Sequence, residues 1–167
     1  LSRARGVHPV DAGFLLGTFN VLGILGNLAA TVVAARLRDQ RPAVAGALSL
    51  MMVGLLGIML APTATALVWA IVLGISQGAA LSLALLLIVL RSADGNVAAR
   101  LSSMAQSGGY AIAASGPLVM GALHGATGGW TAPLAFLLAV SVAIWLPGLA
   151  AARDAQIGAA PDARDTR

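Results

Sequence analysis

Charged residues are so widely separated in this chain that they divide it into long uncharged stretches. Residues 12–35, 42–90 and 101–152 contain no Asp, Glu, Lys or Arg, and the stretches are 24, 49 and 52 residues long. A helix that crosses the hydrocarbon core of a bilayer needs about 20 apolar residues. The three stretches therefore hold one, two and two such helices. We predict an all-α, polytopic membrane helical bundle with five transmembrane helices.

Two polar turns divide the longer stretches into helical hairpins. In residues 62–65 (Pro-Thr-Ala-Thr), the proline lacks a backbone N–H donor, and the threonines supply hydroxyl groups that solvate a turn. Residues 125–130 combine three glycines with a tryptophan suited to the membrane interface. The predicted spans are about 12–35, 43–61, 66–90, 101–123 and 131–151. We thus expect one transmembrane domain over residues 1–152 and a polar tail over 153–167.

The composition agrees with a membrane protein and excludes several other classes. Hydrophobic residues make up 59% of the chain and charged residues 10%, against about 25% charged in a typical soluble domain. The sequence contains no cysteine, which excludes disulfides, thiolate catalysis and Cys-based metal sites within it. Its net charge of +4 is spread over loops and termini, so we expect no nucleic-acid partner. No span carries a carboxylate, so we expect no catalytic residue, no metal, no cofactor and no enzyme.

The arginines indicate how the bundle is oriented. Eight of the ten basic residues fall where the first, third and fifth predicted spans end, or beyond them, and only Arg3 and Arg5 fall on the other side. Basic residues near span ends stay in the cytoplasm. We therefore expect a multi-pass protein of the cell (inner) membrane. Its N-terminus and both uncharged turns would lie outside, and its tail in the cytoplasm.

Polar residues within the spans are unevenly distributed. They concentrate in spans one, three and four, and include Asn20, Gln77, Gln106 and Tyr110. Polar groups at membrane depth usually face the bundle interior or a water-filled path. We therefore predict that these three spans line a common site where the four residues contact a solute, with spans two and five facing lipid. The alternative is that each amide only hydrogen-bonds a neighbouring helix.

Small residues and helix breakers add three narrower expectations. Gly74 and Gly78 form a small-xxx-small pair, which favours close helix packing in lipid. Pro117 is expected to disturb the fourth helix beyond Tyr110, and broken helices are common where transporters bind substrate. His124 is expected to cap the outer end of that helix rather than to couple protons.

Several motifs resemble a known family. Residues 104–110 (MAQSGGY), with 116–118 (GPL) and 121–124 (GALH), resemble the eleventh helix of the cyanate/nitroimidazole permease group of the major facilitator superfamily. Segments 74–79 (GISQGA), 86–92 (LLIVLRS) and 127–130 (TGGW) agree with it. The resemblance covers about residues 8–152. It implies that the five spans are equivalent to helices 8–12 of a twelve-helix transporter, in which helices eight, ten and eleven line the cavity.

The resemblance also implies a function and partners. It implies a secondary transporter that moves a small polar or anionic organic solute by alternating access. The partners would be the solute, the lipid bilayer and the missing N-terminal half of the same transporter. The rival interpretation is a structural or assembly membrane domain without a transport path.

The loop after the first span resembles the repeated cytoplasmic signature of the superfamily, which helps to latch the inner gate. Its charged residues are Arg36, Arg38, Asp39 and Arg41. Ala35 stands where the signature often has an acidic residue, and Asp39, one turn later, is the candidate substitute. A solvated positive-inside loop explains the same arginines without any latch.

Overall fold

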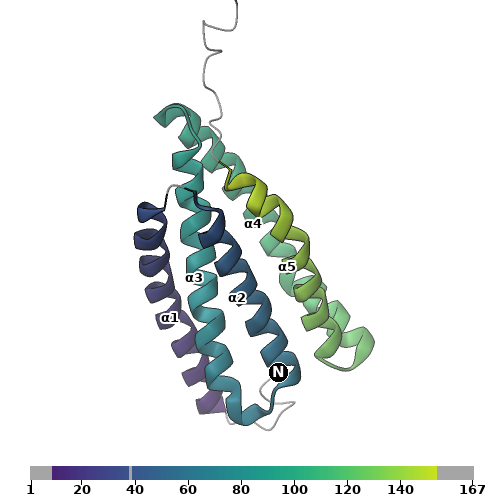
Figure 1. The fold of residues 1–167 in the computed structure, drawn as a ribbon. Helices are drawn as coiled ribbons and strands as arrows, with labels where there is room; N and C mark the ends of the chain where they lie inside the picture. Colours follow the sequence, from purple (N-terminus) through teal and green to yellow (C-terminus); the bar gives the residue numbers. More distant parts are fainter. Residues whose placement is uncertain (1–8, 38, 154–167) are drawn as a thin grey trace, which may run out of the picture.

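The protein, described here from a computed structural model, is a bundle of long α-helices (Figure 1). The structure describes residues 9–37 and 39–153, so the expected tail lies outside the described residues beyond Arg153. The helices are α1 (Pro9–Arg36), α2 (Arg41–Leu60), α3 (Ala66–Leu90), α4 (Gly95–Thr127) and α5 (Thr131–Ala151), with a short 3-10 turn, η2 (Thr63–Thr65), before α3. The predicted all-α helical bundle is confirmed.

Four helical segments are long and apolar enough to cross a membrane. They are Val10–Arg36, Arg41–Leu60, Thr63–Leu90 and Thr131–Ala151. The remaining helix, α4, has 33 residues but is more polar than the others. At 1.5 Å per residue it is about 50 Å long, which exceeds the thickness of the hydrocarbon core. A membrane-spanning segment within α4 thus stays a prediction. The length of the helix permits such a segment.

The turn between α2 and α3 lies where the sequence predicted it. α2 ends at Leu60, and the hydroxyl of Thr65 donates to the carbonyl oxygen of Pro62 at 2.8 Å. The indole Nε1 of Trp69 then donates to the Thr65 hydroxyl at 3.0 Å. These two hydrogen bonds link Pro62 in the turn, through Thr65, to Trp69 in the first turn of α3.

The turn between α4 and α5 is shorter than residues 125–130, because α4 continues to Thr127. Gly128 ends the helix with a left-handed backbone (φ 65°), and its N–H donates to the carbonyl oxygen of His124 at 2.8 Å. The His124 ring stacks on Trp130 with 4.4 Å between centroids. Its Nδ1 lies 3.0 Å from the carbonyl oxygen of Gly129. His124 thus orders this turn, as expected for a residue at a helix end.

α4 also begins six residues before the predicted start of the fourth span at residue 101. The cause is Asp94, whose carboxylate accepts hydrogen bonds from the backbone N–H groups of Asn96 at 2.8 Å and Val97 at 2.9 Å. A side-chain cap of this kind lets a helix begin in a polar segment, before the first apolar run. Hydropathy alone does not detect such a start.

The closest packing in the bundle joins α1 to α3 along most of their lengths (Figure 1). Glycines make this approach possible. A Cβ added to Gly78 would overlap the carbonyl oxygen of Gly23, and one added to Gly74 would overlap that of Phe19. A Cβ on Gly26 would likewise overlap the backbone of Ile75. The predicted role of Gly74 and Gly78 in close packing is confirmed, with α1 as their partner.

α2 lies against both α3 and α5, whereas α4 is held loosely. A buried apolar cluster occupies the end of the bundle where α1, α3 and α5 end and α2 begins; its members include Ala34, Val44, Leu48, Leu83 and Leu87. We call this end the arginine end, because it carries Arg36, Arg41, Arg91 and Arg153. α4 makes few contacts with α3 and α5, and none of its residues is buried.

Candidate functional site

The four predicted solute-contacting residues lie near the middle of three helices. They are Asn20 in α1, Gln77 in α3, and Gln106 and Tyr110 in α4. Asn20 and Gln77 are at similar depth, since each is within one turn of the contact between Gly23 and Gly78. Gln106 and Tyr110 are one helical turn apart. Asn20 and Gln77 therefore lie at similar depth on two adjacent helices, and Gln106 and Tyr110 lie close together on α4.

The hydrogen bonds of these residues stay within their own helices. Nδ2 of Asn20 donates to the carbonyl oxygen of Leu16 at 2.8 Å, and Nε2 of Gln106 donates to the hydroxyl of Ser102 at 2.8 Å. Within residues 9–37 and 39–153, no hydrogen bond joins any two of the four predicted residues. The bond from Gln106 to Ser102 orients that amide along α4.

All four side chains are exposed on this chain, and Tyr110 is 71% exposed. Moving a polar group from water into hydrocarbon, where it has no hydrogen-bond partner, costs several kcal/mol. If the predicted spans cross a membrane, exposed amides and a phenol at these positions need water or protein beside them. The exposed side chains offer N–H, O–H and carbonyl groups at the surfaces of α1, α3 and α4.

Arg91 is a buried residue at the arginine end, and its position in the sequence indicated only the orientation of the bundle. It caps the C-terminus of α3 and is 7% exposed. Its Nη2 donates to Oε1 of Gln40 at 2.9 Å and to the carbonyl oxygen of Ala152 at 2.9 Å. Gln40 precedes α2 and Ala152 follows α5. One guanidinium therefore ties together the ends of three helices.

Among the charged residues of the predicted gating loop that the structure describes, the hydrogen bonds and the ion pair are local. The Asp39 carboxylate accepts from the backbone N–H of Arg41 at 3.1 Å, and its other oxygen lies 3.8 Å from Nε of Arg41. Both side chains are about half exposed, so this ion pair contributes little to stability. Arg36 is exposed in the last turn of α1, and Arg38 lies outside the described residues. The latch stays a prediction.

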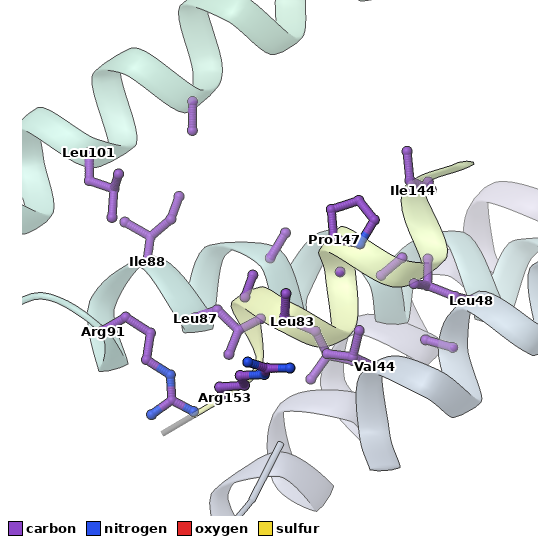
Figure 2. Close-up of a pocket in the computed structure, with 17 residues that line it drawn as sticks. Val44, Leu48, Leu83, Leu87, Ile88, Arg91, Leu101, Ile144, Pro147 and Arg153 are labelled. Carbon is purple, nitrogen blue, oxygen red and sulfur yellow. The ribbon is translucent and has the colours of Figure 1, made fainter. Parts of the chain in front are cut away.

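A cavity of about 700 Å³ lies between α2, α3, α4 and α5 (Figure 2). Its wall is apolar apart from Arg91 and Arg153 at the arginine end. None of Asn20, Gln77, Gln106 and Tyr110 lines it. The cavity and the predicted solute-contacting residues are thus separate features.

Three known proteins are similar in sequence to this chain. The chain is 37% identical over 156 residues to an uncharacterized transporter, YycB, of Bacillus subtilis, and 35% identical over 154 residues to the 2-nitroimidazole transporter of Escherichia coli. It covers 39% of the length of each. It is 36% identical over 119 residues to a putative anionic 4-hydroxy-benzoate permease of Thauera aromatica, and covers 72% of that protein.

No protein-family model matches the chain, and no solved structure is significantly similar to it. The long apolar helices define a polytopic membrane protein, and all three relatives bear the names of transporters or permeases. The chain belongs to the transporter family of these three proteins, the nitroimidazole permease group that its motifs resemble. It spans about two fifths of the length of the first two relatives.

Proposed function

We propose that this chain is the C-terminal five-helix part of a secondary transporter of the major facilitator superfamily. The whole protein would move a small polar or anionic organic solute across the cell membrane by alternating access. One observation carries the proposal: polar side chains with open hydrogen-bonding groups occupy mid-helix positions on α1, α3 and α4. In a transporter, two half-bundles rock around a site at this depth.

The names of two relatives indicate a narrower class of solute. 2-Nitroimidazole and 4-hydroxybenzoate are both small planar rings that bear a group with two oxygen acceptors, a nitro group in one and a carboxylate in the other. Amide N–H groups and a phenol O–H can donate to such oxygens. We assign Asn20, Gln77, Gln106 and Tyr110 as this chain's donors to a solute of that class. A cationic partner for an anion would come from the rest of the protein.

The rival function, an assembly domain without a transport path, predicts that the same residues only join helices. Uptake of labelled 4-hydroxybenzoate and 2-nitroimidazole by cells that carry the full-length protein separates the two. Gln106→Ala is expected to reduce uptake of 4-hydroxybenzoate about tenfold or more, because one hydrogen bond to a charged carboxylate contributes about 1.5–3 kcal/mol.

Asn96→Ala is the matched control for this substitution. Asn96 is an exposed amide in the first turn of the same helix, far from its middle. Protein levels in the membrane are compared by immunoblot. Equal uptake by the Gln106 variant, the Asn96 variant and the parent would remove Gln106 from the site; no uptake of either solute by the parent would remove the solute class.

We also propose that the arginine end faces the cytoplasm, which agrees with the distribution of basic residues. The chain has no cysteine, so single cysteines can report its topology. Ala64→Cys in the turn between α2 and α3 is expected to react with an impermeant maleimide added to intact cells, and Asn96→Cys only after permeabilisation. Label on the unsubstituted parent is subtracted. Reaction of Asn96→Cys in intact cells, with Ala64→Cys protected, would reverse the orientation.

A further inference from the structure

The amides of Asn20 and Gln106 are oriented by hydrogen bonds within their own helices. Nδ2 of Asn20 donates to the carbonyl oxygen of Leu16, one turn earlier in α1, at 2.8 Å. A backbone carbonyl can only accept, so the amide nitrogen must face it, and Oδ1 is directed away from it. Nε2 of Gln106 likewise donates to the hydroxyl of Ser102, one turn earlier in α4, at 2.8 Å. In both residues the helix uses an amide N–H and leaves the amide oxygen.

Each of these amides keeps one carbonyl oxygen and one N–H for another partner. In the part of the chain that the structure describes, no hydrogen bond reaches Oδ1 of Asn20 or Oε1 of Gln106, and both side chains are exposed. An amide oxygen has two lone pairs and is a good acceptor. The predicted solute-contacting residues therefore present two oriented acceptors in addition to their N–H and O–H donors.

An amide oxygen selects a property of the solute that a nitro or carboxylate group does not supply. Both groups carry only acceptor oxygens, which repel the amide oxygen and leave it without a donor. An acceptor that stays unpaired after water is displaced costs free energy. A site built to bind an O–H or N–H group therefore rejects an analogue that lacks this group.

We propose that the solute must carry a hydrogen-bond donor, an O–H or N–H group, and that Asn20 and Gln106 recognise this donor through their amide oxygens. This rests on the proposed function, because it concerns the same residues and the same transported solute. The two solutes tested there meet the requirement, since 4-hydroxybenzoate has a phenolic O–H and 2-nitroimidazole a ring N–H. Ser102 is a positioning residue, because it holds the Gln106 amide in the orientation that leaves Oε1 open.

Competition for uptake of labelled 4-hydroxybenzoate, by cells that carry the full-length protein, tests the donor. Three competitors keep the carboxylate and differ only at the fourth ring position. 4-Aminobenzoate has N–H donors there, 4-methoxybenzoate has an oxygen acceptor without a hydrogen, and 4-fluorobenzoate has no donor. 4-Aminobenzoate is expected to compete about as well as unlabelled 4-hydroxybenzoate. The other two are expected to compete at least about tenfold more weakly.

Two variants assign this preference to the amide oxygens. Asn20→Leu removes one acceptor at nearly constant size, and Ser102→Ala keeps Gln106 but releases its amide. Both are expected to reduce the preference for 4-aminobenzoate over 4-fluorobenzoate, whatever their effect on the rate of uptake. Asn96→Ala, in the first turn of α4, is expected to keep the full preference. Protein levels in the membrane are compared by immunoblot.

The outcomes separate this inference from the proposed function. Equal competition by 4-fluorobenzoate and 4-aminobenzoate in the parent would overturn the donor requirement and leave the transport function standing. A full preference in both the Asn20 and the Ser102 variants would overturn the assignment to these amides. If the parent takes up only 2-nitroimidazole, 1-methyl-2-nitroimidazole, which lacks the ring N–H, is the donor-free competitor. Uptake of neither solute would remove the solute class and the donor requirement together.

Discussion

Gly78→Ala is expected to lower the free energy of unfolding of the bundle by about 1–3 kcal/mol, the cost typical of overpacking a close contact. The added methyl group would overlap the backbone carbonyl of Gly23, which a helix cannot move without moving α1 as a whole. Gly78→Leu is expected to separate α1 from the rest of the bundle, because α1 contacts the rest of the chain almost entirely through α3.

Gly46→Ala is the matched control for this prediction. Gly46 lies within α2, and a Cβ at that position meets nothing within 4 Å. Alanine there is expected to be neutral or to stabilise by about 0.5–1 kcal/mol, since it reduces the entropy of the unfolded chain. The measurement is the apparent unfolding temperature in detergent, followed by size-exclusion chromatography. Equal unfolding temperatures for the Gly78 and Gly46 alanine variants would mean that α1 and α3 do not touch at Gly78.

Much of this fold could be predicted because two physical constraints act directly on the sequence. The thickness of the bilayer sets the length of each span, and the cost of burying charge keeps the arginines at helix ends. The turn at 62–65 follows from Pro62 and its hydroxyl neighbours. By contrast, the start of α4 at Gly95 depends on one carboxylate cap, Asp94, in a segment without hydrophobic signal.

The candidate site was less accessible to sequence reasoning. Gln77 and Gln106 could be selected, because amides are rare in apolar helices, but their spacing along the chain does not identify the groups they contact. Arg91 was missed as a structural residue for another reason. It contacts Gln40 and Ala152, which are 51 and 61 positions away in the chain. No local pattern distinguishes it from an exposed arginine such as Arg41.

Arg91→Met is expected to destabilise the bundle by about 3 kcal/mol, because it removes hydrogen bonds from a charged donor that contribute about 1.5–3 kcal/mol each. The guanidinium is buried where α2, α3 and α5 meet, and the carbonyl of the buried Ala152 would lose its donor. Arg41→Met makes the same change of charge at the same end of the bundle. Arg41 is exposed, and its pairing with Asp39 is worth at most about 1 kcal/mol.

Unfolding temperatures of the Arg91, Gln40 and double variants decide whether the effect comes from the contact itself. Arg91→Met and Gln40→Ala are expected to be less than additive, with a coupling free energy of about 1–2 kcal/mol, because both remove the same 2.9 Å hydrogen bond. Additive effects, or an equal loss with Arg41→Met, would assign the destabilisation to the loss of positive charge. Because one guanidinium joins three helix ends, its removal should also loosen the arginine end, which hydrogen exchange of the α5 C-terminus would detect.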